Sequence, residues 1–317
     1  MKTETLFPFK VYSRMWLAAC LYFAMWAMVG CRNHAAVKGD DFVDGSSTSS
    51  PDSGSDSVDE KVSDNGFSGI MPVKTIYLAR HGRTHMNRIG WINGRFKWDH
   101  LDPLGYRQRV GLFALLKDEP IHAVFVSELN RTRQTADPLA KHFGLTPIIA
   151  PELNEFSGGI FEGMCQGAGR KLPPEDPRSE CFVVSDDSLV KMGDDLLLEE
   201  ILKSQKGGID YRAPGGGESV RDVSKRLKLF FAKLSSLPVE SEILIVGHGG
   251  TNRFLLALLM GWNLEDSRKI RQGHTQVFRL TRTEKTPPDL DVFVNGRWTG
   301  CSGPPDPKKG LECLRSD

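Results

Sequence analysis

The sequence has almost no net charge and few cysteines, and both shortages exclude classes of protein. Its 317 residues carry 41 Lys and Arg against 40 Asp and Glu, so no overall field favours nucleic acid or a polyanionic surface as a partner. None of the six cysteines forms the close Cys-x-x-Cys pair that is typical of structural zinc. The content of 39% hydrophobic and 26% charged residues predicts a folded protein with one large or two small domains.

Long apolar stretches are also scarce. One stretch of sixteen uncharged residues, 15–30, follows a segment with three basic residues and one acidic residue, which predicts a signal peptide over residues 1–30. Met28-Val29-Gly30-Cys31 resembles the lipobox of bacterial lipoproteins, in which the cysteine becomes the lipidated first residue. An uncleaved anchor is the alternative, since sixteen residues lie near the lower limit for a membrane span. Both interpretations predict export, with the chain held at the membrane and facing the periplasm or the cell exterior.

The segment that follows is expected to be a tether. Residues 31–70 are rich in Ser, Gly and Asp, with eight acidic residues against three basic ones. Such a segment cannot bury enough apolar surface to offset its ordering entropy, so we expect a disordered acidic linker. Residues 71–283 are expected to form the folded domain, with a cap insert at about 164–211. Residues 284–317 are a Pro-rich extension, with either a short hairpin around Asn295-Gly296 or a disordered end.

The domain alternates between strand and helix patterns. Runs of β-branched and aromatic residues predict buried strands at 75–79, 123–127, 146–150 and 242–246, with an edge strand at 277–281. Helical spacing predicts helices at 104–116 and 219–234, the second with Ser219 and Asp222 as a capping box, and a further helix at 189–206 in the cap. Strands separated by helices need crossovers, so we expect an α/β fold of three layers, a mostly parallel sheet with helices on both faces.

Chemically active side chains follow three of the predicted strands. Arg80 and His81 come directly after the first strand, Arg131 follows the second, and His248 follows the fourth. One histidine in such a place is usually an ordinary residue, but the carboxyl ends of parallel strands meet at one edge, where ligands bind. Arginine forks suit phosphate oxygens, and a neutral imidazole attacks phosphorus. With Gly82 leaving room for an anion on backbone N–H groups, the set predicts a phosphoryl pocket.

These motifs resemble the histidine phosphatase superfamily, also called phosphoglycerate mutase-like. The resemblance covers about residues 73–282, and its blocks stand in the family's order. They are R-H-G-x-T-x-x-N at 80–87, L-x-P-x-G-x-x-Q at 101–108, S-x-L-x-R-x-x-Q-T at 127–135, L-x-E-x-x-x-G-x-x-E-G at 153–163, a P-G-G-E-S block at 214–219, and V-x-H-G-G at 246–250. The resemblance implies the fold of that family.

The resemblance also implies roles for individual residues. His81 would be the nucleophile and become a phosphohistidine, and Glu155 would be the general acid that protonates the departing alkoxide. The phosphoryl oxygens would be held by Arg80, Asn87, Arg131 and His248. Histidines outside the motifs, among them His274, receive no role.

Glu155 has two rivals inside the motif blocks, Glu162 and Glu218. A carboxylate beside an arginine is more often an ion-pair partner than an acid catalyst, so the motif position of Glu155 decides in its favour. Phosphoryl transfer depends mostly on positioning and charge stabilisation. Because the sequence shows no metal-ligand spacing, we expect hydrolysis without a metal or other cofactor.

The expected function is hydrolysis of a small phosphomonoester by an enzyme of the histidine acid phosphatase type, attached to the membrane through lipidated Cys31. Phosphoglycerate mutase-type phosphoryl transfer is the first alternative, but residues 156–163 are closer to the phosphatase pattern, and an exported chain is separated from glycolytic intermediates. The second alternative is a non-catalytic lipoprotein that binds a phosphorylated ligand. All matched positions are filled, which favours an enzyme.

Four cysteines remain for the exported domain, and an oxidising compartment favours their pairing. They allow three pairings, and the sequence does not choose among them. We favour Cys301 with Cys313, since both lie in the same short tail. Cys165 with Cys181 would then staple the start of the cap, and the alternative is that either of these two is a buried free thiol, the commoner state of an isolated cysteine in an α/β enzyme.

Overall fold

The structure is a computed structural model, and it describes residues 71–163, 203, 206–306 and 310–314. The predicted signal peptide and linker lie outside these ranges, as do Cys165, Cys181 and nearly all of the helix expected at 189–206. Within the ranges described, no helix combines the length and the apolar character that crossing a membrane requires.

The described part of the chain contains one seven-stranded sheet in the order β3-β2-β4-β1-β5-β6-β7. The strands are β1 (Thr75–Arg80), β2 (Ala123–Val126), β3 (Ile148–Ile149), β4 (Glu242–Gly247), β5 (Val277–Thr281), β6 (Asp289–Val294) and β7 (Arg297–Cys301). Strands β3, β2, β4 and β1 pair in parallel, and the remaining ladders, from β1 to β7, are antiparallel. The three strands whose ends carry the active side chains, β1, β2 and β4, therefore all lie in the parallel half of the sheet.

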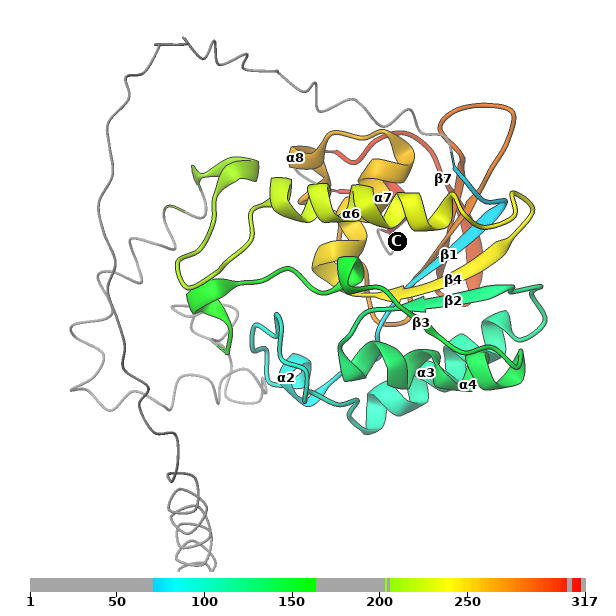
Figure 1. The fold of residues 1–317 in the computed structure, drawn as a ribbon, viewed down its shortest axis with the longest axis horizontal. Coiled ribbons are helices and arrows are strands. Elements are labelled where there is room, and N and C mark those ends of the chain that lie inside the picture. Colours follow the sequence, from blue (N-terminus) through cyan, green and yellow to red (C-terminus); the bar gives the residue numbers. More distant parts are fainter. Residues whose placement is uncertain (1–70, 164–202, 204–205, 307–309, 315–317) are drawn as a thin grey trace, which may run out of the picture. The chain divides into compact units, whose positions relative to one another are not determined.

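Helices cover both faces of this sheet, as Figure 1 shows. They are α2 (His85–Arg88), α3 (Pro103–Leu116), α4 (Asn130–His142), α6 (Val220–Leu234), α7 (Gly249–Met260) and α8 (Leu264–Ser267). Helices α3 and α4 pack on one face over a core that includes Val124 and Val246, and α6 to α8 pack on the other over a core that includes Phe230 and Phe254. The predicted three-layer α/β fold is confirmed.

Local sequence explains where the helices begin. The predicted capping box of α6 is present, because the Ser219 hydroxyl accepts from the Asp222 backbone and the Asp222 side chain accepts from the Ser219 backbone. Helix α3 starts at Pro103 behind an Asp102 cap. Helix α7 is buried all round from Phe254 to Met260, as expected for a helix packed between a sheet and other helices.

The C-terminal strands extend the sheet beyond β5, where the sequence predicted its edge. The prediction of an edge strand at 277–281 is wrong, since β5 lies between β1 and β6. Beyond it, β6 and β7 form the hairpin that the sequence offered as one alternative, and its turn residues Asn295 and Gly296 have φ of 51° and 78°. Two positive φ angles are what an Asn-Gly hairpin turn requires. The sheet thus continues into the Pro-rich tail.

Strand register brings the motifs together. Strand β4 lies between β1 and β2, Arg80 is paired with Gly247, and Val126 is paired with Val246. Because all three strands run in the same direction, the residues that follow them leave the sheet side by side. His81, Ser127 and His248 therefore share one edge before any side-chain contact is considered.

The tail is fastened by the predicted disulfide between Cys301 and Cys313, whose Cα atoms are 5.4 Å apart. It joins the end of β7 to a short helical turn, Glu312–Leu314, that contacts β6 and β7 and packs against the core. Just before that turn, Gly310 approaches the backbone of Lys269, where a Cβ would come within 2.9 Å of the Lys269 carbonyl oxygen.

We expect Cys313→Ser to lower the free energy of unfolding by about 3 kcal/mol. The disulfide restricts the unfolded chain by closing a short loop, and its removal gives that conformational entropy back to the unfolded state. Chemical denaturation of oxidised protein measures the change. Cys301→Ser and the double variant should lose the same amount, since all three remove one bond. Two alkylatable thiols at these positions in the oxidised wild type would contradict the assignment.

Candidate active site

His81 lies at the centre of the site, only 2% exposed. Its ring Nδ1 is 2.8 Å from the carbonyl oxygen of Gly82, and a carbonyl only accepts, so Nδ1 carries the proton. Its backbone N–H donates to the Gly247 carbonyl at 3.0 Å, which ties β1 to β4 at this point. The other ring nitrogen, Nε2, therefore carries the lone pair of a neutral imidazole.

His248 packs against His81, with ring centroids 5.1 Å apart. The Arg131 Nε–H donates to its Nδ1 at 3.3 Å, so its Nε2 carries the proton and donates to the Ser127 hydroxyl at 2.8 Å. Both ring nitrogens are thus engaged by the protein. Ser127 belongs to one of the motif blocks, but the motif indicated no role for it.

Arg131 is fully buried, and its guanidinium is occupied by backbone oxygens of residues 93–96. Its Nη2 donates to the carbonyls of Asn93 and Gly94 at 3.0 and 2.8 Å, and its Nη1 donates to the carbonyl of Phe96 at 2.9 Å. The loop therefore surrounds the charge with the kind of acceptor that a phosphoryl group would also present.

Arg80 differs from Arg131 because part of its guanidinium has no partner. Its Nη1 donates to the Gln272 carbonyl at 2.9 Å, but its Nε is buried without a hydrogen bond in the part of the chain that the structure describes. The guanidinium also lies against the start of α7, where a Cβ on Gly249 would approach its Cζ to 3.1 Å. The absence of a side chain at Gly249 thus leaves room for the Arg80 guanidinium at this edge of the sheet.

Glu155 meets the same helix start from the other side. Its carboxylate accepts from the backbone N–H groups of Gly250 and Thr251 at 3.1 and 3.0 Å, and from the Thr251 hydroxyl at 3.2 Å. A Cβ on Gly250 would come within 2.5 Å of this carboxylate. A carboxylate suits the positive end of a helix dipole. The start of α7 therefore orients Glu155, and the first of its donors, Gly250, stands two positions after His248 in the chain.

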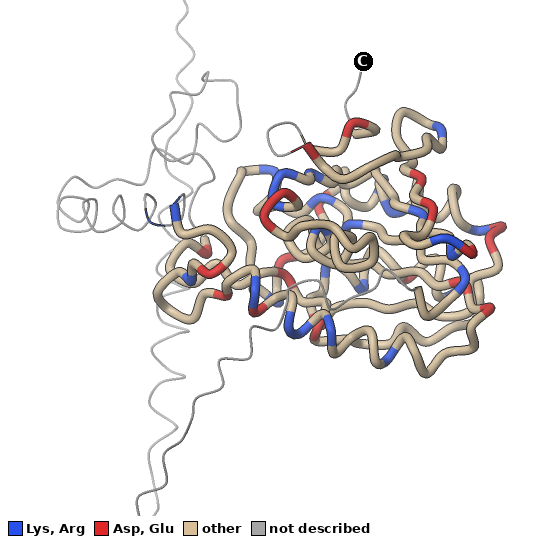
Figure 2. Tube along the Cα trace, turned by 90° about the horizontal axis from the view of Figure 1, so that it is seen from above, with Lys and Arg blue, Asp and Glu red and all other residues tan. Residues whose placement is uncertain are grey.

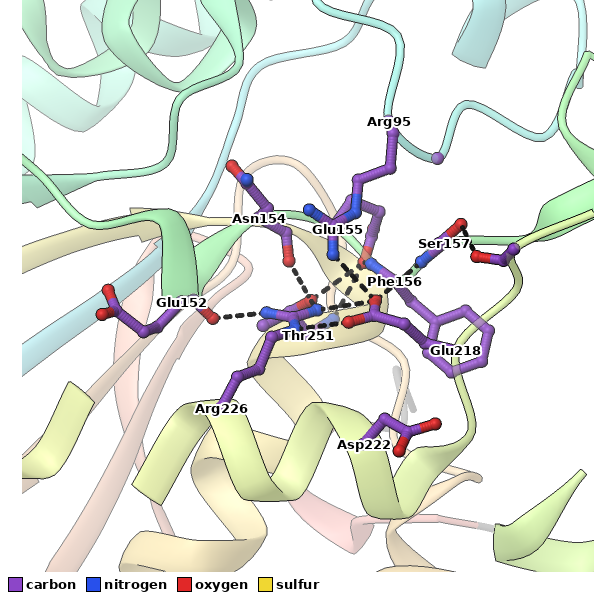
Figure 3. A network of polar contacts seen from close by, with 12 residues as sticks. Arg95, Glu152, Asn154, Glu155, Phe156, Ser157, Glu218, Asp222, Arg226 and Thr251 are labelled. Atoms are coloured by element: carbon purple, nitrogen blue, oxygen red, sulfur yellow. Dashed lines mark hydrogen bonds and ion pairs between the residues drawn. The ribbon is translucent and has the colours of Figure 1, made fainter. Parts of the chain in front are cut away.

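The two rival carboxylates have other partners. Glu218 forms ion pairs with Arg226 at 2.8 Å and with Arg95 at 3.0 Å, as Figure 3 shows for the network around Thr251. Burial alone would raise the pKa of Glu218, but hydrogen bonds and charge from Arg226 outweigh it and hold the pKa below its ordinary value. Glu162 accepts from the backbone N–H groups of Arg95 and Gly158, both at 3.0 Å.

Gly82 is a glycine for a different reason than the sequence suggested. Its N–H donates to the Thr135 hydroxyl at 2.9 Å, so it is not free for an anion. A Cβ at this position would approach the Gly105 carbonyl to 2.7 Å. The requirement is thus close packing of two backbone segments, which also explains why two motif blocks each contain a glycine.

Asn87 has only local contacts among the interactions described. Its side-chain oxygen accepts from the Thr84 backbone at 3.3 Å, and its own backbone N–H donates to the Thr84 hydroxyl at 3.2 Å. These bonds form the capping box of α2. The structure thus places Asn87 at a helix start, whereas Arg80, His81, Arg131, Glu155 and His248 gather around the ends of β1 and β4.

The site also contains two residues that the sequence left without a role. His274 donates from Nδ1 to the backbone carbonyl of His81 at 2.7 Å, with ring centroids 5.4 Å apart. Gln272 accepts from Arg80 through its backbone carbonyl, and its side chain donates to the Leu78 carbonyl at 2.9 Å and accepts from Asn252. Both stand about 190 positions from β1, and no motif marked them.

Electrostatics keep the three imidazoles neutral. Burial, followed by the charge of Arg131, holds the pKa of His81 and of His248 well below its ordinary value. Burial and the charge of Arg80 lower the pKa of His274 to about 4. Basic and acidic residues are interspersed along the described trace in Figure 2. The positive charge that acts on the histidines therefore comes from the arginines of the site itself. The arrangement supplies a neutral nucleophile, fixed cations and an oriented carboxylate.

Comparisons with known proteins agree with this chemistry. A model of the histidine phosphatase superfamily (branch 1) matches residues 76–185 and 195–294, and so includes β6. A Yersinia pestis protein named "Probable phosphoglycerate mutase GpmB" is 26% identical over 209 residues, which cover 66% of this chain and 85% of that protein.

Solved structures show the same fold. The α-ribazole phosphatase of Shigella flexneri is 25% identical, with a TM-score of 0.53 over 66% of this chain and 91% of that one. A mycobacterial glucosyl-3-phosphoglycerate phosphatase in complex with VO3 is 22% identical, with a TM-score of 0.51 over 70% and 98% of the two chains.

We expect His274 to make stability depend on pH. Its pKa of about 4 in the folded protein lies below the value of about 6.5 in an unfolded chain, so the unfolded chain takes up the proton first as the pH falls. The contribution of neutral His274 to the free energy of unfolding is therefore fully present above pH 6.5 and is lost as the pH falls from 6.5 to 4. In that window the unfolding free energy of His274→Gln should fall less steeply than that of wild type, by up to about 1.4 kcal/mol per pH unit. Parallel curves would contradict the assignment.

Proposed function

The chain belongs to the histidine phosphatase superfamily, and we propose that it hydrolyses small phosphomonoesters through a phosphohistidine on His81. The observation that carries the proposal is the hydrogen bond from His81 Nδ1 to the Gly82 carbonyl, because it leaves Nε2 as the unprotonated nitrogen of a buried, neutral imidazole. That nitrogen attacks phosphorus, and the bond from phosphorus to the ester oxygen breaks.

Glu155 supplies and removes the protons in this proposal. It protonates the departing alkoxide, then takes a proton from a water that attacks the phosphohistidine, and the P–N bond breaks to release phosphate and restore His81. Its hydrogen bonds to Gly250 and Thr251 support the assignment, since they hold its carboxylate near His248 while Glu218 is committed to ion pairs.

The cations bind the phosphoryl oxygens. The unpartnered Nε of Arg80 offers one donor directly. On Arg131, phosphoryl oxygens take the place of the carbonyl oxygens of Asn93, Gly94 and Phe96, because a charged acceptor bonds a guanidinium more strongly than a neutral one. His248 then acts mainly by orienting Arg131.

A phosphoglycerate mutase-type reaction is the second candidate, favoured by the name of the Yersinia pestis relative. It uses the same phosphohistidine and differs in the acceptor, which is a second substrate hydroxyl and not water. Incubation with 3-phosphoglycerate separates the two, since a phosphatase releases inorganic phosphate and a mutase forms 2-phosphoglycerate.

We expect the purified domain to hydrolyse p-nitrophenyl phosphate in the presence of a chelator, and His81→Ala to abolish turnover. Arg80→Ala should lower kcat/KM by about 100-fold or more, since removal of one donor to a developing anion typically costs about 3 kcal/mol. Release of p-nitrophenolate is followed by its absorbance. Wild-type rates in His81→Ala would refute the mechanism.

Replacement of Glu155 should depend on the leaving group. Glu155→Gln keeps the hydrogen-bond acceptor but removes the transferable proton, so esters of alkyl alcohols should slow far more than p-nitrophenyl phosphate, whose phenolate departs with little protonation. The kcat of the two substrate types gives the ratio, and Glu162→Gln is the matched control with no such difference. Equal slowing of both types by Glu155→Gln would remove this residue from the acid role.

We further propose that the chain is exported and anchored by lipid on Cys31, as the Met28-Val29-Gly30-Cys31 segment suggests. Labelled palmitate should be incorporated by wild type and not by Cys31→Ser. Membrane association without label would instead favour an uncleaved anchor.

A further inference from the structure

A pocket with a volume of about 220 Å³ lies beside Phe156, the residue that follows Glu155. Its walls come from the segment after Glu155, from residues 208–213, from the start of α6, from α7, and from Arg268, the residue that follows α8. The lining includes three aromatic side chains, Phe156, Phe161 and Tyr211. It also includes two arginines, Arg253 and Arg268. The pocket therefore combines an apolar, aromatic surface with two positive charges.

Arg253 is the unusual member of the set. Its Nη1 donates to the Arg268 carbonyl at 3.0 Å, and its guanidinium lies over the Phe254 ring at 4.8 Å. Its Nε is buried without a hydrogen bond, and no carboxylate among the described residues forms an ion pair with it. Burial lowers its pKa to about 10, so it remains charged at neutral pH. The Arg253 side chain as a whole is partly exposed, but a guanidinium N–H that is buried without a hydrogen bond is costly for a folded protein.

Neighbouring groups balance this charge only in part, through the charge of Glu155, which raises the pKa of Arg253 against the effect of burial. Arg271 also donates to the Arg268 carbonyl, at 3.3 Å, which adds a cation to the cluster, and the carboxylate of Glu265 is paired with Arg268 at 2.7 Å. Glu218 lines the pocket as well, but its oxygens bind Arg226 and Arg95. Among the described side chains, Glu155 therefore acts on Arg253 only through its charge, and no carboxylate forms an ion pair with the guanidinium, which leaves it open to a direct anionic partner.

We propose that this pocket, the Arg253 pocket, binds a small organic anion whose carboxylate or phosphate lies on Arg253 and whose apolar body packs against Phe156, Phe161 and Tyr211. The anion is either a second charged group on the substrate's leaving alcohol or a separate small molecule, and the chemistry of recognition is the same. Binding at this pocket does not require hydrolysis at His81.

Benzoate is a suitable probe, because it joins a carboxylate to an aromatic body. Calorimetric titration should show benzoate binding to wild type, and binding about tenfold or more weaker in Arg253→Met, which keeps an unbranched apolar stem but removes the guanidinium and its charge. Arg271→Met is the matched control, since Arg271 contacts the same carbonyl and adds positive charge but does not line the pocket, so its loss should weaken benzoate binding clearly less than Arg253→Met does.

Kinetics distinguish the two sources of the anion. If the substrate supplies it, Arg253→Met raises the KM for 4-carboxyphenyl phosphate about tenfold and leaves that for p-nitrophenyl phosphate unchanged. If a separate molecule supplies it, both esters respond alike and benzoate changes the turnover of both. A wild type that binds benzoate without hydrolysing either ester would overturn the proposed hydrolysis and leave the Arg253 pocket standing.

Wild-type protein offers a readout that needs no variant. Titration with benzoate should shift the Arg253 side-chain Nε–H and the ring protons of Tyr211 in NMR spectra. No binding to wild type, equal affinity in a folded Arg253→Met, or shifts confined to other surfaces would overturn the proposal.

Discussion

The parallel pairing of β1 with β4 is the constraint on which the site depends. Arg80 stands opposite Gly247, so the two histidines that follow leave the sheet side by side, and the His81 backbone N–H closes the ladder on the Gly247 carbonyl. Strand β2, on the other side of β4, delivers Ser127 to the same edge. Residues from three distant segments thus meet because a parallel register aligns the ends of their strands.

Burial sets the chemistry at that edge. Two arginines and three imidazoles share a largely buried region. Burial first, and then the charge of Arg131 or Arg80, holds the pKa of each imidazole below its ordinary value, so the histidines stay neutral. A neutral imidazole with its Nδ1 proton fixed by a carbonyl is a nucleophile without further activation. The glycines at 249 and 250 complete the arrangement, because they let a guanidinium and a carboxylate approach the start of α7 from two sides.

Much of this could be predicted from the sequence, because its signals were local. Apolar runs marked β1, β2 and β4, the Ser219 and Asp222 pair marked the start of α6, and the polar residues directly after the strands marked the edge. The features that were missed depend on long-range contacts. Nothing near His274 indicates that it bonds the His81 carbonyl, and nothing near Gly82 indicates Gly105. The interior position of β5 follows from a hairpin in a Pro-rich tail whose local pattern favoured irregular structure.

The central claim is that His81 Nε2 carries the phosphoryl group during turnover. The direct measurement is to mix wild type with p-nitrophenyl phosphate, stop the reaction in alkali within one turnover, and locate phosphate by mass spectrometry of the peptides. The account predicts an acid-labile phosphoryl group on the peptide that contains His81, and none in His81→Ala. A phosphoryl group on His248 or His274, or turnover by wild type with no phosphorylated peptide at any time, would contradict it.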